Sequence, residues 1–168
     1  MNIGVFAGSY DPIHLGHIDL ITRSLKFCDK LIIGLGINPS KKCLFDEEER
    51  LSMIKESLSE FLFPNELIKV EVLIFKKLLV DFAHEHNANL IIRGVRTNSD
   101  YEYEANLASI NKALSTVETV LLITNPLYSI FSSSAIKEIA KYGGNIGKFT
   151  PECVSKKMKD KFNSPFLL

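Results

Sequence analysis

Two histidines, His14 and His17, are the residues whose type and spacing point most directly to chemistry. They end the stretch Gly8–His17, which follows an apolar run and precedes an amphipathic one. A strand, a glycine-containing turn and a helix form a common binding site for phosphate, because backbone N–H groups and the helix dipole favour anions at a helix start. Ser9 adds a hydroxyl to the same turn. The stretch predicts an enzyme that handles a nucleotide.

Three other polar clusters offer groups that bind phosphate. The segment Asn38–Lys42 contains two lysines, which act as point charges beside phosphates. Arg93 and Arg96 flank Gly94, and the planar fork of arginine suits bidentate phosphate binding. Three serines at 132–134 precede a helical pattern and offer hydroxyls for its N-cap or for phosphate. Alone, the lysines indicate a solvated loop and the serines a helix cap; beside the histidines, both favour a binding role.

Hydrophobic periodicity indicates which elements position these clusters. Short apolar runs predict strands at 3–7, 30–37, 68–75, 89–93 and 117–124. Amphipathic patterns predict helices at 17–27, 46–61, 79–86, 100–114, 132–142 and 151–162. This alternation predicts an α/β fold in which helices cover a parallel sheet. We expect a Rossmann-like, doubly wound sheet of five strands with helices on both faces and a helical C-terminus, in a single domain over residues 1–168.

The order of strands and clusters along the chain predicts a shared site. Each of the four clusters follows a predicted strand, the serines as the end of the segment Asn125–Ser134. Ligands of open α/β sheets bind beyond the carboxyl ends of the strands. We therefore expect the histidine turn, the lysine loop, the arginine pair and the serines to meet at one edge of the sheet.

Composition narrows the class of partner. The 20 Lys and Arg residues balance the 20 Asp and Glu residues, which argues against a large nucleic-acid footprint. No apolar run approaches the roughly 18 residues needed to span a membrane, and the first residues lack the pattern of a secretory signal. Cys28, Cys43 and Cys153 form no metal-ligand or disulfide pattern. We expect a cytoplasmic protein that acts on small molecules, without nucleic acid or membrane partners.

The segment His14-Leu15-Gly16-His17 resembles the signature of the nucleotidyltransferase superfamily with the histidine-any-glycine-histidine motif. Together the four clusters resemble the bacterial phosphopantetheine adenylyltransferases, over about residues 3–162. The matching segments are Pro39–Lys42, Ile92–Arg96, Asp100–Glu104 and Phe131–Ser134. The resemblance implies that the phosphate of 4′-phosphopantetheine attacks the α-phosphate of ATP directly, without a covalent enzyme intermediate. Nicotinamide- and nicotinate-mononucleotide adenylyltransferases share the histidine and serine motifs and remain the alternative.

The resemblance also implies roles for matching residues. It implies catalytic roles for His17 and Lys41, and binding of the acceptor substrate by Ser9, Lys41, Leu79 and Arg93. It implies binding of ATP by Ser9, Tyr10, His17, Gly94, Val95, Arg96, Glu104, Tyr128, Ser129, Ile130, Phe131, Ser132, Ser133 and Ser134. Mg²⁺ is expected to arrive with ATP, held mainly by phosphates and water rather than by a protein metal site. A homohexamer and feedback inhibition by coenzyme A are implied as well.

Two positions depart from the family pattern. His14 stands where many members have threonine, which brings the motif closer to the wider superfamily. Lys76 and Lys77 stand where relatives often carry small or acidic residues, beside the expected site of the pantetheine arm. The resemblance therefore leaves open how tightly this chain holds the arm and how strongly coenzyme A inhibits it.

Overall fold

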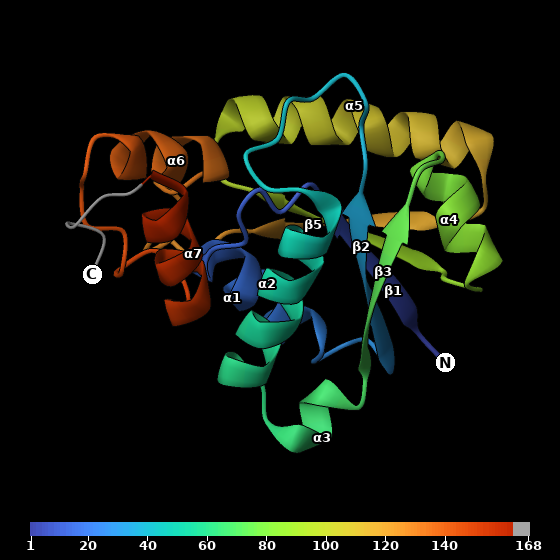
Figure 1. Ribbon diagram of the computed structural model, residues 1–168. Helices are drawn as coiled ribbons and strands as arrows, with labels where there is room; N and C mark the ends of the chain where they lie inside the picture. The colour runs from blue at the N-terminus through green and yellow to red at the C-terminus, as the bar shows by residue number, and fades with distance from the viewer. Residues whose placement is uncertain (163–168) are drawn as a thin grey trace.

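The computed structural model describes residues 1–162 and shows a five-stranded parallel sheet with the order β3-β2-β1-β4-β5 (Figure 1). The strands are β1 Ile3–Gly8, β2 Lys30–Gly36, β3 Val70–Phe75, β4 Leu90–Val95 and β5 Glu118–Ile123. The chain winds outward from β1 to β3 and then, on the other side, from β4 to β5, so the winding reverses between β1 and β4. The predicted Rossmann-like sheet is confirmed.

The described residues also form seven helices. These are α1 Leu15–Ser24, α2 Glu47–Phe61, α3 Pro64–Leu67, α4 Leu79–Glu85, α5 Asn98–Leu114, α6 Ser133–Lys141 and α7 Glu152–Phe162. The six predicted helices are present, although α1 begins and ends earlier than predicted. The sequence did not predict α3, because four residues are too few to show a helical period.

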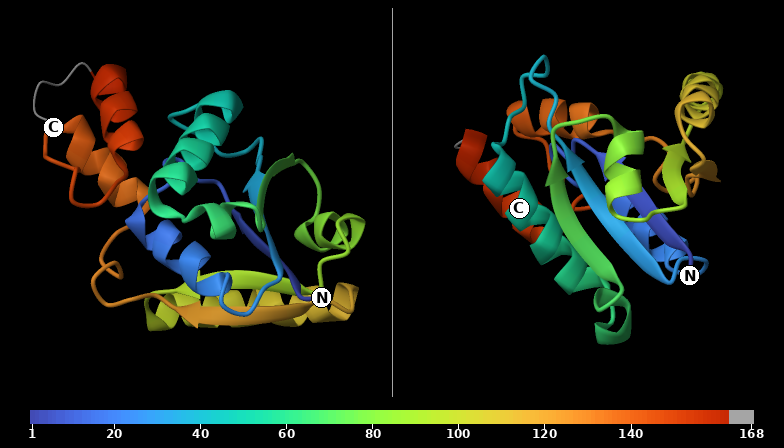
Figure 2. Two further views of the ribbon diagram at one scale, coloured as in Figure 1. Left: turned by 90° about the horizontal axis from the view of Figure 1, so that it is seen from below. Right: turned by 90° about the vertical axis from the view of Figure 1, so that its right-hand side faces the viewer.

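Helices cover both faces of the sheet, which explains why the central strands are apolar almost throughout. Side chains alternate along β1. Phe6 joins a core cluster beneath α1, α2, α6 and α7, whereas Val5 and Ala7 join a second cluster that includes α4. In the right-hand view of Figure 2, α2 and α7 lie on one side of the strands and α4 and α5 on the other. The predicted two-faced arrangement is confirmed.

Local end signals fix the helices that border the site. Asp46 accepts the N–H of Glu49 at 2.8 Å, and Glu49 accepts the N–H of Asp46 at 2.9 Å, so a capping box starts α2. Ser132 caps α6 by accepting the N–H of Ala135 at 3.1 Å. Gly143 ends α6 with a φ of 77°, a conformation that glycine adopts without steric cost.

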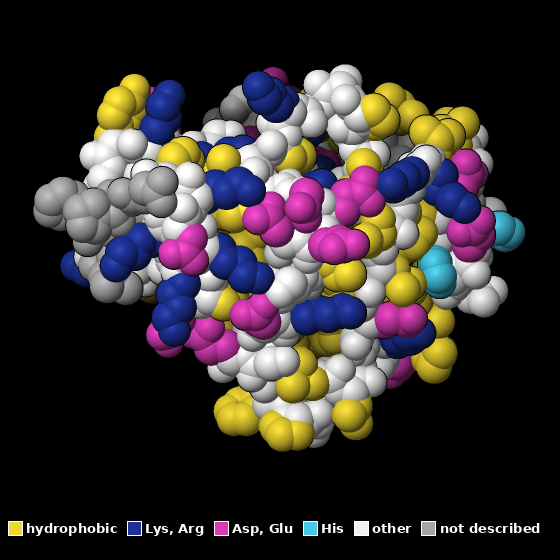
Figure 3. Space-filling model, viewed as in Figure 1, with side chains coloured by type: hydrophobic (Ala, Val, Ile, Leu, Met, Phe, Trp, Pro, Cys, Tyr) yellow, Lys and Arg dark blue, Asp and Glu magenta, His cyan; other side chains and the backbone are white. Residues whose placement is uncertain are grey.

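Charges of both signs are mixed over the surface formed by α2 and β3 (Figure 3). Ion pairs join α7 to α2, between Lys161 and Glu49 and between Lys157 and Glu56. Such exposed pairs contribute little to stability, but they leave no broad basic area on this face. None of the helices within residues 1–162 has the length and apolar character needed to cross a membrane.

Candidate active site

A cavity of about 860 Å³ lies at the carboxyl edge of the sheet. The strands end level with one another there, since Gly8 pairs with Leu35 and Val95 with Ile123. All four predicted clusters contribute to the cavity lining, through Ser9, His14, His17, Lys41, Arg93, Gly94, Arg96, Ser132 and Ser133. The clusters therefore meet in one place, as their positions after four of the five strands predict.

The two histidines are held as neutral hydrogen-bond donors. His14 is the N-cap of α1, where its Nδ1 accepts the N–H of Gly16 at 3.1 Å. The Nδ1 of His17 accepts the N–H of His14 at 3.2 Å. With Nδ1 occupied as an acceptor, the proton of each neutral ring resides on Nε2. The ring centroids lie 3.8 Å apart, so the two rings lie side by side.

Burial keeps these rings uncharged at neutral pH. It lowers the pKa of His14 to about 4, with a further contribution from Arg96. Burial likewise holds the pKa of His17 well below its usual value, assisted by His14 and by the charges of Arg96 and Arg93. A neutral imidazole then faces a cavity whose net charge comes from arginine and lysine.

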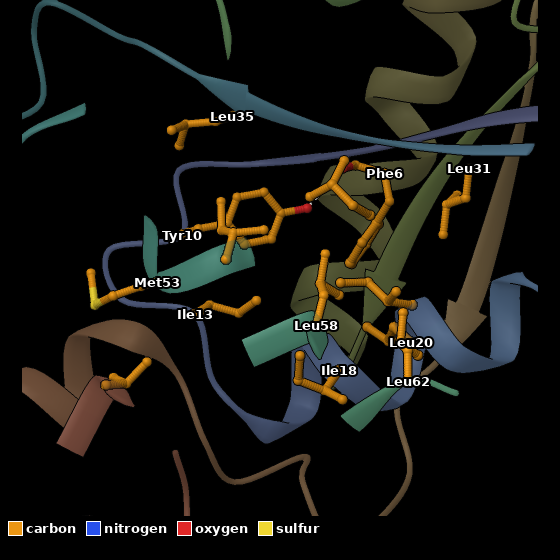
Figure 4. Packing of buried hydrophobic residues seen from close by; sticks show 14 of the residues in the cluster. Phe6, Tyr10, Ile13, Ile18, Leu20, Leu31, Leu35, Met53, Leu58 and Leu62 are labelled. Carbon is orange, nitrogen blue, oxygen red and sulfur yellow. Dashed lines mark hydrogen bonds between the residues drawn. The ribbon is translucent and has the colours of Figure 1, made fainter. Parts of the chain in front are cut away.

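Tyr10 supports His17 from the core side. Its ring centroid lies 5.1 Å from that of His17 at 65°, and its hydroxyl donates to the Phe6 carbonyl at 2.7 Å. Figure 4 shows the Tyr10 ring among the core side chains beside Phe6. The side chain is 1% exposed. The family resemblance implies that Tyr10 contacts ATP, which stays a prediction; its hydroxyl is already bonded to the Phe6 carbonyl.

Arg93 is oriented by two long-range partners. Its Nε and Nη2 donate to the two carboxylate oxygens of Glu104 at 2.8 and 2.7 Å, and its Nη1 donates to the Ala7 carbonyl at 2.8 Å. Glu104 is the only residue of α5 that is buried. Its predicted role as an ATP contact is untested, and the observed pairing makes it the residue that fixes the guanidinium plane.

Arg96 joins the end of β4 to the serine segment. It donates to Asp100 through Nε at 2.8 Å and to the Phe131 carbonyl through Nη1 at 3.0 Å. Ser133 then donates to the Pro12 carbonyl at 2.8 Å, which connects α6 to the histidine turn. These contacts close the cavity on the side of β4 and β5.

Two buried charges hold the histidine turn against the loop that carries Lys41. Asp11 is 3% exposed and accepts the N–H groups of Leu44 and Phe45, each at 3.0 Å, and the ammonium of Lys137 at 2.6 Å. Arg50 is 4% exposed and donates to the Ser9 carbonyl at 2.9 Å. Sequence reasoning assigned no role to either residue, because all these partners are remote along the chain.

The comparisons with known proteins agree with the site. Residues 5–139 match the model of the cytidylyltransferase-like family. The phosphopantetheine adenylyltransferase of Caldanaerobacter subterraneus subsp. tengcongensis is 43% identical over 163 residues, which cover 96% of this chain and 98% of that one. The phosphopantetheine adenylyltransferase of Psychromonas ingrahamii is 44% identical over 155 residues, 92% of each chain. This chain belongs to the phosphopantetheine adenylyltransferase family.

Solved structures support the fold. A putative nicotinate-nucleotide adenylyltransferase from Vibrio parahaemolyticus covers 99% of this chain and 98% of its own with a TM-score of 0.70 at 16% identity. A lipopolysaccharide core biosynthesis protein from Thermoplasma volcanium covers 74% of this chain and 98% of its own with a TM-score of 0.54 at 28% identity. At 16% identity, the similarity to the Vibrio parahaemolyticus protein shows only that the two chains share a fold.

Within the family framework, the structure separates residues that reach the cavity from those that do not. Tyr128, Ser132 and Ser133 line it, whereas the predicted ATP contacts Val95, Ser129, Ile130, Phe131 and Ser134 lie outside its lining. Leu79 also lines the cavity, and its contact with the pantetheine arm stays a prediction.

The lysines that depart from the family pattern are exposed and paired with glutamates. Lys76 pairs with Glu47 at 2.8 Å and Lys77 with Glu85 at 2.5 Å. Both line the cavity near Leu79. Lys76 and Lys77 therefore place two solvated ammonium groups at the rim of the cavity.

Carboxylates at the cavity are committed to arginines, Asp100 to Arg96 and Glu104 to Arg93. Within residues 1–162, no group of three or more His, Cys, Asp or Glu side chains is arranged to hold a metal ion. The polar groups that remain are N–H, hydroxyl and ammonium donors, which suit phosphate oxygens.

Proposed function

We propose that this protein transfers the adenylyl group of ATP to 4′-phosphopantetheine, forming dephospho-coenzyme A and pyrophosphate. The observation that carries the proposal is the convergence of neutral His17, Lys41 and fixed Arg93 on one cavity at the sheet edge. Its membership of a family whose curated relatives are named phosphopantetheine adenylyltransferases supports this acceptor.

The reaction is a direct displacement at phosphorus. A phosphate oxygen of phosphopantetheine bonds to the α-phosphorus of ATP, the bond from that phosphorus to the bridging oxygen breaks, and pyrophosphate leaves with the electron pair. The attacking and leaving groups are both phosphates, so positioning and charge stabilisation matter more than proton transfer. The Nε2–H of His17 supplies a donor to the α-phosphate that needs no reorganisation. Lys41 and Arg93 hold the acceptor phosphate.

We propose that Mg²⁺ enters with ATP and is held by its phosphates and by water. Asp100 and Glu104 are neutralised by arginines, so they offer the ion little. When bound, Mg²⁺ supplies further charge neutralisation on the triphosphate; the residues described above align the reacting groups.

A mononucleotide acceptor is the second candidate, favoured by His14, which completes the wider superfamily motif. The deciding experiment supplies ATP and Mg²⁺ with either 4′-phosphopantetheine or nicotinamide mononucleotide and follows pyrophosphate release. We expect turnover with phosphopantetheine. Turnover with the mononucleotide alone would replace the first proposal by the second.

Lys41 offers a test of the acceptor site. Among the described residues it forms no ion pair, and it is exposed at the cavity. We expect Lys41→Ala to raise the KM for phosphopantetheine about 10-fold or more, since a charged hydrogen bond to phosphate is lost, while the KM for ATP changes less. Lys42→Ala, an adjacent exposed lysine outside the cavity lining, is the matched control. Equal KM values for phosphopantetheine in both variants would contradict the assignment.

We further propose that the chain forms the homohexamer implied by its family resemblance. Large apolar side chains are exposed on α5, at the end of β5 and just beyond it, including Ile110 at 54%, Leu114 at 61%, Ile123 at 75% and Leu127 at 72%. A second copy of the chain would remove this area from water. Sedimentation should give a mass six times the 18.9 kDa of one chain, and Leu114→Glu should lower it. A monomeric wild-type protein at micromolar concentration would contradict this proposal.

Coenzyme A contains the pantetheine and adenylate parts of both ligands, so we propose that it competes for the same cavity as a feedback inhibitor.

We propose that the reaction takes place in the cytoplasm, where ATP is available. The free cysteines Cys28, Cys43 and Cys153 are compatible with a reducing compartment.

A further inference from the structure

Thr124, the residue after β5, carries an unpartnered hydroxyl. Among residues 1–162 its Oγ1 is the only buried side-chain nitrogen or oxygen atom without a hydrogen-bond partner. The residue is 5% exposed and lines the cavity. A buried hydroxyl without a partner is destabilising, so such a group in a cavity wall points to a partner supplied by a ligand.

Strand pairing fixes this hydroxyl in place. The backbone N–H of Thr124 donates to the Val95 carbonyl at 2.9 Å, which continues the ladder between β4 and β5 by one residue. The threonine therefore cannot turn its backbone away from the cavity, and its branched side chain has few rotamers. The sheet therefore fixes the position of Thr124 in the cavity wall.

The strand order indicates which part of the ligand lies there. The histidine turn follows the central strand β1, so the reacting phosphates belong at the middle of the sheet edge. Lys41 and Leu79, on the acceptor side, follow β2 and β3. Thr124 follows β5, at the opposite end of the edge. If the acceptor lies beside β2 and β3, the nucleoside part of ATP must extend toward β5 and Thr124.

Two glycines line the same cavity as Thr124. At Gly94 a Cβ atom would lie 2.3 Å from Leu20 Cδ1, and at Gly16 it would lie 3.0 Å from the His14 ring, so a side chain at either position would crowd its neighbour. The cavity is therefore lined there by backbone, by Leu20 and by the His14 ring. A purine base can lie against such surfaces while a polar group meets its edge.

We propose that Thr124 Oγ1 hydrogen-bonds an edge atom of the adenine base and thereby sets the preference of the site for ATP. This inference rests on the proposed adenylyl transfer. It adds a residue that neither the sequence motifs nor the family resemblance selected.

The test compares Thr124→Val, which keeps the shape and removes the hydroxyl, with Thr124→Ser, which keeps the hydroxyl. We expect Thr124→Val to weaken ATP binding, measured by calorimetry and as KM, by about 5- to 20-fold. The KM for phosphopantetheine should change less than about twofold, and Thr124→Ser should recover most of the ATP affinity. The melting temperature of the ligand-free valine variant should be equal or higher, because the unpartnered hydroxyl is gone.

Analogues locate the contact. Purine riboside triphosphate lacks the 6-amino group, and 7-deaza-ATP lacks N7. One of them should bind wild type more weakly than ATP yet bind Thr124→Val as ATP does. The proposal is overturned if Thr124→Val binds ATP as wild type does, or if both analogues lose the same affinity in both proteins. Calorimetry needs no acceptor, so an enzyme that failed to use phosphopantetheine would still give a clear result on Thr124.

Discussion

His17→Ala should lower kcat by about 10²- to 10³-fold, the usual effect of removing one preorganised donor to developing negative charge. The KM for ATP should change much less, because the predicted ATP contacts Arg96, Ser132 and Ser133 still line the cavity. The reason is the fixed tautomer: the His14 backbone N–H occupies Nδ1 of His17, which leaves Nε2–H as the donor. Steady-state pyrophosphate release over a range of ATP concentrations measures both constants.

His84→Ala, on an exposed residue of α4 outside the cavity, is the matched control and should behave as wild type. The pH profile adds an independent readout. Because the pKa of His17 is held well below its usual value, protonation of His17 should cause no fall in wild-type kcat between about pH 8 and 6. Near-normal kcat in His17→Ala would show that another group stabilises the α-phosphate.

Asp11→Ala should destabilise the fold by about 3 kcal/mol, the low end expected for breaking a buried ion pair. The low end applies because the Lys137 side chain retains 27% exposure and can regain some water. The substitution also leaves the N–H groups of Leu44 and Phe45 without their acceptor. Urea unfolding gives the free energy. Asp160→Asn, at an exposed residue of α7, is a control expected to stay within about 0.5 kcal/mol of wild type.

The pH dependence of this effect has a definite sign. Burial alone would raise the pKa of Asp11, but Lys137 and the two backbone N–H groups outweigh it and hold the pKa below its usual value. A carboxylate with a lowered folded-state pKa contributes stability above its unfolded pKa, and this is lost as pH falls through the folded value. The difference between wild type and Asp11→Ala should therefore shrink below about pH 4. A difference that stays constant down to pH 2 would contradict a charged Asp11.

Features with a local cause could be predicted from the sequence. Alternating apolar runs and helical periods predicted the parallel sheet, and the Asp46 and Ser132 caps needed only neighbours within three residues. The start of α1 was wrong by two residues, because a histidine is an unusual N-cap and His14 was read as part of the turn.

Features with distant causes could not be predicted. Asp11 accepts hydrogen bonds from Leu44, Phe45 and Lys137, which lie 33, 34 and 126 residues away in the sequence. No local sequence pattern predicts contacts between such distant residues. No sequence pattern indicates a role for Thr124, because its hydroxyl is distinguished only by the lack of a hydrogen-bond partner in the folded structure. The roles of the catalytic residues are still predictions, whereas their convergence is an observed property of the fold.

The contacts of α6 with the histidine turn link activity to one short helix. Ser133 and Lys137 both come from α6 and hold Pro12 and Asp11, so the reactive geometry is set by a segment far along the chain from β1. The sheet itself does not depend on these two contacts. On heating, loss of activity can therefore precede global melting, because α6 can detach while the strands remain paired.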